Sequence, residues 1–320
     1  MQRRRAYTAA FDGKEPAPAT AKRGTTPGTF DALAIEYFKS GDYRALAPAT
    51  RAQYRRSIER ILREENIGHR QVAGMTRDHV KTIMGRRENA LGAANETLKK
   101  LRALINFALE ADPPWRRDDP THKVQLFRSG SHHTWTDDEL ATFEARWPVG
   151  TRERTIYALL LFTGQRIGDV VKMSWRDIEG GAIHVHQGKT DEKLWIPMHP
   201  SLGAALKAWK RAHVAIITTA YGRPFSAHGL GNEVARSIEL AGLPDRCVAH
   251  GLRKAAARRL AEAGCSAKEI AAITGHKTLK EVERYTAAAD QKRLAFSAME
   301  KLKAGTSIPN PEKRVGRGRK

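Results

Sequence analysis

Six side chains in the second half of this sequence have the chemistry that metal-free transfer of a phosphodiester requires. Two arginines can hold the non-bridging oxygens of a phosphate and stabilise the charge that develops in the transition state. A tyrosine is a competent nucleophile for a covalent intermediate when a nearby base takes its proton. A lysine can protonate the departing oxygen as general acid. The candidates are Arg166, Lys189, His250, Arg253, His276 and Tyr285.

The sequence around each candidate predicts the element that carries it. Arg166 follows a glycine break at Gly164 and opens a helix, with Asp169 three residues on and hence on the same helical face. Lys189 lies in the turn of a predicted hairpin, where Lys193 also lies. Taken alone, the first segment is a helix junction with an exposed ion pair, and a turn lysine is usually solvated.

The remaining candidates belong to three successive helices. His250 and Arg253 share one face of a helix that ends near Gly264. His276 lies in a tight turn between two short helices, and Tyr285 lies two turns into the second of these. A tyrosine there would by itself indicate a core position. It is the combination of all six residues that favours chemistry.

The order and spacing of these residues resemble the tyrosine recombinase (phage integrase) family. The resemblance rests on Thr-Gly-x-Arg around Arg166, the hairpin lysine, His-x-x-Arg at 250–253, Gly-His at 275–276, and nine residues from His276 to Tyr285. It covers about residues 134–300, and the helical segments before them are similar to the family's core-binding domain.

The resemblance implies a role for each residue. Tyr285 would attack the scissile phosphate, form a 3′-phosphotyrosine link and free a 5′-hydroxyl. Lys189, or Lys193 in its place, would protonate the leaving 5′-oxygen. His250 would assist proton transfer, and His276 would donate a further hydrogen bond.

The two arginines complete the implied site. Arg166 and Arg253 would bind the phosphate, and Asp169 would orient Arg166 from behind. Three positions depart from the family pattern: Asp169 replaces a more frequent Glu, Lys254 stands where His is common, and Thr274 stands where Leu is common. None of these differences removes a reactive group.

As a whole, the resemblance implies a site-specific recombinase that integrates or excises a mobile element such as a prophage. No cofactor, metal or ATP would be required, because the bond energy is kept in the covalent link. The partners would be double-stranded DNA and three further copies of the chain in a tetramer, with an accessory DNA-bending protein as an optional addition and no membrane.

Other functions remain open at this point. A chromosome- or plasmid-dimer-resolving recombinase would share the mechanism, and a type IB topoisomerase would share the residues but rejoin the same strand. A DNA-binding relative with a decayed site is disfavoured because all six positions hold reactive types. A metal-dependent nuclease is disfavoured because no acidic ligand pattern accompanies the paired histidines.

Charge supports a polyanionic partner independently of these motifs. The formal net charge is +21. Residues 1–26 contribute +4 and residues 301–320 contribute +6, which leaves +11 on the residues between them. Such an excess points to nucleic acid. Two cysteines give no disulfide framework, and no segment predicts a secretory signal or membrane span, so we expect a cytoplasmic, nucleoid-associated protein.

Periodicity predicts a mainly α fold with a small β-hairpin or sheet. Residues 1–26 read as a flexible basic arm, 27–114 as a helical core-binding (DNA-binding) domain and 115–133 as a linker. Residues 134–300 read as a mixed α/β catalytic domain of the tyrosine recombinase type, and 301–320 as a basic tail.

Within these domains the predicted elements are specific. The first domain should hold helices near 30–39, 50–65, 76–85 and 93–111. In the second, strands are expected at 182–186 and 194–198, and the chain should be nearly all helical from residue 201 onwards. The apolar residues of 290–303 suit docking on a neighbouring subunit, or simple packing on their own domain.

Overall fold

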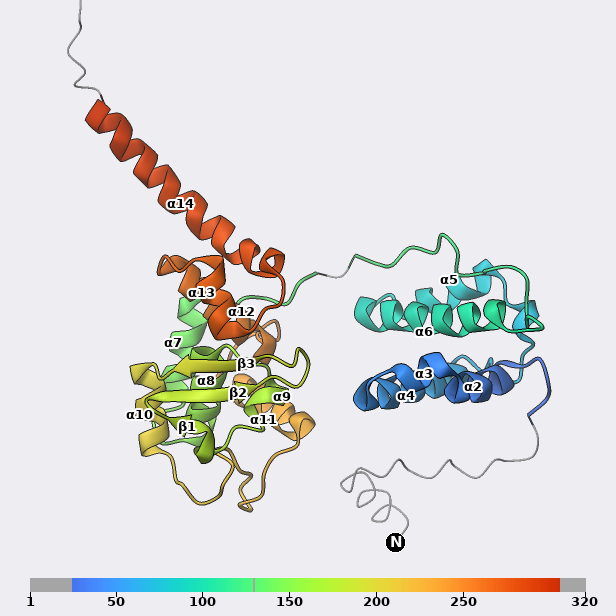
Figure 1. Ribbon diagram of the computed structural model, residues 1–320, viewed down its shortest axis with the longest axis horizontal. Helices are drawn as coiled ribbons and strands as arrows, with labels where there is room; N and C mark the ends of the chain where they lie inside the picture. Colours follow the sequence, from blue (N-terminus) through green and yellow to red (C-terminus); the bar gives the residue numbers. More distant parts are fainter. Residues whose placement is uncertain (1–24, 129, 306–320) are drawn as a thin grey trace, which may run out of the picture. The chain divides into compact units, whose positions relative to one another are not determined.

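The computed structural model describes residues 25–128 and 130–305 and divides the chain into two compact units, residues 1–130 and 131–320. Both units are built mainly of helices, and one small sheet lies in the second (Figure 1). The predicted mainly α fold class with a small sheet is therefore confirmed. Most of the predicted arm, 1–26, and of the predicted tail, 301–320, lies outside the described residues.

Unit 1 is a helical bundle around an apolar core. Its buried residues include Phe30, Leu33, Ile58, Leu101 and Ile105, which recur at helical spacing along the chain. The elements are α2 (Phe30–Lys39), α3 (Gly41–Ala45), α4 (Pro48–Glu64), η1 (Val72–Gly74), α5 (Arg77–Gly85) and α6 (Leu91–Glu110).

Much of the segment expected to be a linker, 115–133, packs on unit 1. Arg116 is only 4% exposed. Its guanidinium donates to the carbonyls of Val72 and Met75 at 2.9 and 3.1 Å. Val124 is buried in the same core, and Arg102 donates to its carbonyl at 2.6 Å. The absence of periodicity in this segment reflects irregular backbone that is held by side chains, so residues 115–127 extend unit 1.

Unit 2 is organised around one buried helix, α8 (Arg152–Thr163). Its sequence is apolar on all sides, as expected for a helix surrounded by protein, and Ile156 to Leu161 are all buried. The helices around it are α7 (Asp137–Arg146), α9 (Ile167–Val170), α10 (Pro200–Ala208), α11 (Ala227–Leu240), α12 (Ala249–Glu262), α13 (Ala267–Thr274) and α14 (Leu279–Gly305).

The sheet is antiparallel, in the order β1-β2-β3. Its strands are β1 (Ile178–Glu179), β2 (Ala182–His186) and β3 (Lys193–Pro197), with η2 (Trp175–Asp177) preceding them. Ile183 pairs with Ile196, and both are buried, whereas His184 is exposed on the other face. The predicted hairpin is present, with β3 beginning one residue early, while the short β1 was not predicted.

Residues 209–226 correct the expectation of continuous helix after residue 201. They form an irregular connection between α10 and α11. Gly222 adopts a φ of 71°, and Pro224 follows it, so the helical hydrogen-bond pattern cannot continue. Ile216 and Ile217 are nevertheless buried and add to the core of unit 2. Among the described residues, no helix has the length and apolarity to cross a membrane.

Candidate active site

Arg166 is placed by a sharp turn between two helices. Gly164 ends α8 with a φ of 63°, and a Cβ there would lie 3.0 Å from the Thr274 methyl group, so glycine is required for both conformation and space. Arg166 is the residue before α9 and is half-buried. Its Nη1 donates to the side-chain oxygen of Gln187 at 3.2 Å and lies 3.9 Å from a carboxylate oxygen of Asp169.

Arg253 lies in α12 and is 2% exposed. Its Nη1 donates to two main-chain carbonyls, those of Gly164 and Thr274, at 2.7 Å each. These carbonyls belong to the ends of α8 and α13, so one guanidinium joins three helices. Because both acceptors are neutral, these bonds orient the guanidinium without cancelling its charge.

The two histidines lie beside these arginines. His250 is in the first turn of α12, and a cavity of about 280 Å³ is lined by His250, Arg253, Arg166 and neighbouring residues. His276 follows Gly275, which ends α13 with a φ of 68°. The hydroxyl of Thr274 lies 2.6 Å from His276 Nδ1 and fixes the ring.

Burial and the neighbouring positive charges favour the neutral form of both imidazoles. Burial, then the charges of Arg253 and Arg166, lower the pKa of His276 to about 4. Burial, then His132 and Arg253, lower the pKa of His250 in the same direction, although part of that residue stays open to solvent, which moderates the effect. A neutral imidazole can accept a proton at one nitrogen and donate at the other.

Gln187 is the residue that links these parts, and it was not predicted. It is fully buried just after β2. Its Oε1 accepts from Arg166 and from Thr190, and its Nε2 donates to Gln165 at 2.5 Å and to the Thr274 carbonyl at 2.8 Å. A Cβ at Gly275 would lie 2.4 Å from Gln187 Nε2, so no residue larger than glycine fits at this position. The side chain therefore fixes Arg166 relative to the helix end that carries His276.

Asp169 joins α9 to the hairpin turn. It is 4% exposed, and its Oδ1 accepts from the main-chain N–H of Gly188 at 2.9 Å. Its Oδ2 has no hydrogen-bond partner among the described residues and faces Arg166. One carboxylate thus contacts both the arginine and the turn that carries Lys189, and its orienting role remains a prediction.

The two candidate lysines are both exposed. Lys189 lies in the turn, next to the bonded Gly188, while Lys193 begins β3 opposite His186. His186 in turn bonds Asp191 across the turn at 2.6 Å. Both lysines are therefore accessible to a ligand. Which of the two acts as the general acid remains a prediction.

Tyr285 lies in α14, the helix that packs on α12 and α13 (Figure 1). Its side chain is outside those that the structure describes. The structure therefore brings together Arg166, Arg253, His250 and His276, and it places the tyrosine on a helix adjacent to the elements that carry the last three.

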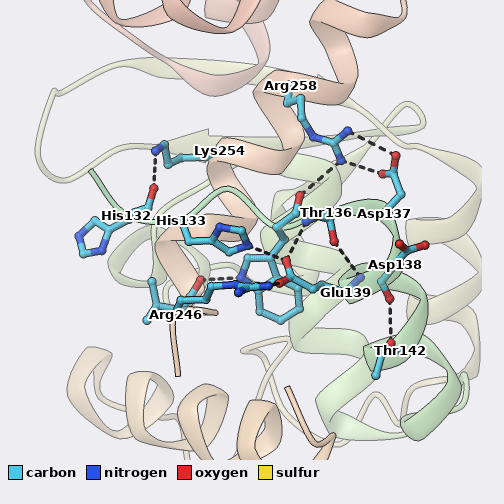
Figure 2. Close-up of polar contacts among 12 residues, drawn as sticks. His132, His133, Thr136, Asp137, Asp138, Glu139, Thr142, Arg246, Lys254 and Arg258 are labelled. Atoms are coloured by element: carbon cyan, nitrogen blue, oxygen red, sulfur yellow. Dashed lines mark hydrogen bonds and ion pairs between the residues drawn. The ribbon is translucent and has the colours of Figure 1, made fainter. Parts of the chain in front are cut away.

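One further cluster of donors has a structural explanation. His133, Glu139 and Cys247 offer ligand atoms within 4.8 Å of one another. Glu139 already accepts from the Thr136 N–H at 2.8 Å, from His133 at 2.7 Å and from Arg246 at 2.9 Å, and these bonds help to lower its pKa to about 2. We assign the cluster to holding the start of unit 2 (Figure 2).

Comparison with known proteins agrees with this geometry. The model of the phage integrase family matches residues 138–292. A tyrosine recombinase XerC of Rhodospirillum centenum is 28% identical over 158 residues, which are 47% of this chain and 46% of that protein. A tyrosine recombinase XerD of Lacticaseibacillus casei is 23% identical over 223 residues, 64% of this chain and 75% of that protein. The matched region spans about half the length of the XerC protein.

Solved structures share the fold. A lambda integrase (75–356) dimer bound to a COC′ core site has a TM-score of 0.68 at 22% identity, covering 81% of this chain and 95% of that one. A Tn1549 transposon integrase in complex with a circular intermediate DNA has a TM-score of 0.67 at 18% identity, covering 83% and 99%. Residues 138–292, most of unit 2, match the phage integrase family, and the relatives named above are tyrosine recombinases.

Proposed function

We propose that this protein is a site-specific DNA recombinase that cuts and rejoins DNA through a covalent link to Tyr285. The observation that supports this most is one cavity lined by Arg166, Arg253 and His250, with His276 close enough to both arginines that their charges lower its pKa. A cavity lined by two guanidiniums suits a phosphate, and imidazoles beside it can move protons.

The proposed reaction consists of two transfers of one phosphoryl group. The oxygen of Tyr285 forms a bond to the phosphorus, and the bond from phosphorus to the 5′-oxygen breaks. The tyrosine proton passes to the His250 imidazole. Lys189 or Lys193 gives a proton to the leaving 5′-oxygen. A 5′-hydroxyl of a second strand then displaces the tyrosine. Because every phosphodiester bond is replaced by another, no ATP is required, and the arginines supply the charge that a metal ion would otherwise provide.

The proposed partner is double-stranded DNA, and the proposed assembly is a tetramer on two sites. The chain carries a net charge of +21, which suits phosphate contacts. A lambda integrase tetramer bound to a Holliday junction is among the solved structures that share the fold. Integration or excision of a mobile element is the biological role that we propose.

A covalent-capture assay tests this function. Purified protein is incubated in EDTA with nicked duplexes taken from the flanks of its own gene, and adducts are sought on a denaturing gel. We expect an adduct from the wild type and none from Tyr285→Phe. An adduct that persists in Tyr285→Phe would contradict the assignment of the nucleophile, and one that requires a divalent metal would contradict the proposed charge stabilisation.

A sulfur leaving group separates the two lysines. A duplex with a 5′-bridging phosphorothiolate releases a thiolate, which needs no protonation because a thiol is far more acidic than an alcohol. We expect the variant that lacks the general acid, Lys189→Ala or Lys193→Ala, to cleave the ordinary duplex slowly and the sulfur duplex at the wild-type rate. The other variant should show no such rescue.

A further inference from the structure

The chain enters unit 2 along one side of α12. We call residues 131–137 the entry segment (Figure 2). Lys254 Nζ donates to the His132 carbonyl at 2.5 Å, and one turn further Arg258 donates to the Trp135 carbonyl at 3.4 Å. Two successive turns of the helix that carries His250 and Arg253 therefore hold the main chain of the entry segment.

The contact is too close for any side chain at Gly251. A Cβ there would lie 2.5 Å from the His133 carbonyl oxygen and 2.6 Å from the Trp135 ring. Trp135 is fully buried, and its Nε1 donates to the Val248 carbonyl, just before α12, at 3.0 Å. Gly251 lies between the two predicted catalytic residues of α12, so the entry segment packs directly against this part of the site.

At the start of this segment, the His132 ring meets the His250 ring. The two ring centroids are 5.2 Å apart, with an interplanar angle of 65° in an edge-to-face arrangement. Such a contact restricts the rotation of both rings. The backbone of His132 is fixed at the same point by Lys254, so the ring is presented from an anchored position.

We propose that His132 is a positioning residue for the active site: its ring holds the His250 imidazole in the orientation that proton transfer at the phosphate needs. The entry segment then belongs to the catalytic apparatus and does more than connect two units. This inference rests on the proposed function, because it gives His250 a part in the reaction.

Electrostatics adds a measurable signature. Several groups that can carry positive charge face His250, from α12, the end of α8, the turn after α13 and the entry segment: Arg253, Lys254, Arg166, His276 and His132. His132 is among the groups whose charge lowers the pKa of His250. Removal of His132 should therefore raise the pKa of His250, so that activity that needs the neutral imidazole is lost at a higher pH.

Two substitutions at His132 separate packing from charge. His132→Ala removes both the ring contact and the electrostatic effect of His132 on His250, whereas His132→Phe keeps an aromatic edge contact. We expect His132→Ala to lower the rate of adduct formation about tenfold. His132→Phe should restore most of that rate. Both should move the acidic limb of the pH–rate profile upward by a few tenths of a pH unit, which a merely structural role would not do.

Titration of the histidine rings by NMR gives a readout that needs no DNA. The His250 pKa should rise in both variants. The matched control is His199→Ala. It removes another histidine of unit 2 that makes an aromatic contact, because the His199 and Phe162 ring centroids are 4.3 Å apart. It should leave the His250 titration and the cleavage rate as they are in the wild type.

A double-mutant cycle tests whether Lys254 acts through His132. Lys254→Met should lower the rate on its own, because the His132 carbonyl loses its donor. If Lys254 positions His132, the effects of Lys254→Met and His132→Ala on the rate will not add. Once Lys254→Met has displaced the His132 ring, removal of that ring costs little more. Strict additivity would contradict this coupling.

The two hypotheses fail in different ways. If the wild-type protein forms no adduct with DNA from any flank of its gene, the result counts against the proposed function. This measurement needs no variant. An unchanged His250 titration together with unchanged cleavage in His132→Ala would overturn the inference while leaving the function intact. If His132→Ala does not fold, His132→Phe still carries the pH test.

Discussion

Each unit contains a cavity bordered by arginine, and the two differ in what the arginines contact. In unit 1 a cavity of about 270 Å³ is lined by Glu65, Arg70 and Arg86 among others. Glu65 is 8% exposed, and it pairs with Arg86 at 2.8 Å and also with Arg87. In unit 2 the cavity of about 280 Å³ is lined by Arg166 and Arg253, which bond an amide and two carbonyls.

The difference is between an arginine paired with a carboxylate and arginines held mainly by neutral oxygens. A guanidinium paired with a carboxylate, as Arg86 is with Glu65, contributes little net charge to its surroundings. A guanidinium held by neutral oxygens is oriented and keeps its charge for a ligand. The carboxylate of Asp169 lies 3.9 Å from Arg166 through Oδ2, while its Oδ1 accepts from the hairpin turn.

The largest effect is expected at Arg166. Arg166→Ala should lower the rate of adduct formation by about 10²–10³-fold, because a phosphate contact that strengthens in the transition state is lost. The melting temperature should fall modestly, because the half-buried side chain makes one hydrogen bond of ordinary length and because the buried Asp169 carboxylate loses the cation 3.9 Å from it. Single-turnover cleavage and thermal denaturation measure the two quantities. A loss smaller than tenfold would argue against a phosphate-binding role.

Gln187 comes next. Gln187→Met keeps the volume and removes the four hydrogen bonds that join Arg166, Thr190, Gln165 and Thr274. We expect cleavage to fall about 10–100-fold, because misplacement of a catalytic group by a fraction of an ångström is costly. Affinity for the DNA site should stay within a factor of a few. Equal losses in affinity and rate would show that Gln187 acts by a route other than positioning.

The comparison predicts the opposite outcome in unit 1. Glu65→Gln removes the charge between Arg86 and Arg87 and should destabilise the protein by about 1–3 kcal/mol, because one partner of a buried ion pair is lost. Cleavage per folded molecule should stay within twofold of the wild type. Chemical denaturation and the adduct assay test both statements, and a large catalytic loss would remove the contrast between the two cavities.

The smallest effect is a pH dependence of stability from His276. Its pKa is lowered from 6.5 to about 4 in the folded chain, so the unfolded chain binds more protons between these values. Stability should therefore fall as the pH drops from 6.5 towards 4, by roughly 1–2 kcal/mol once solvent screening is allowed for. Denaturant titrations at several pH values should show a flatter profile for His276→Gln.

The candidate residues could be named from the sequence because their chemistry is carried by residue type and local spacing. Gly164, two residues before Arg166, and Gly275, just before His276, both have the positive φ that ends a helix. The catalytic lysine could not be chosen, because both candidates lie beside one exposed turn and local spacing does not distinguish them.

The residues that position the site were harder to find. Three of the four partners that Gln187 bonds lie 21 to 87 residues away, and such contacts leave no local pattern. Strand alternation offered one signal, because Ile183 and Val185 point inward and Gln187 continues that alternation beyond β2. The role of the entry segment also depends on a long-range contact, between His132 and His250.

The most direct test is to identify the atom that becomes linked to DNA. The adduct is formed with a duplex that carries a label on the 3′ side of the nick and another on the 5′ side. It is then digested with nuclease and trypsin, and the modified peptide is sequenced by mass spectrometry. The account predicts a nucleotide joined through its 3′-phosphate to Tyr285 in the peptide that begins at that residue, after Arg284. A link to any other residue, or through a 5′-phosphate, would contradict it.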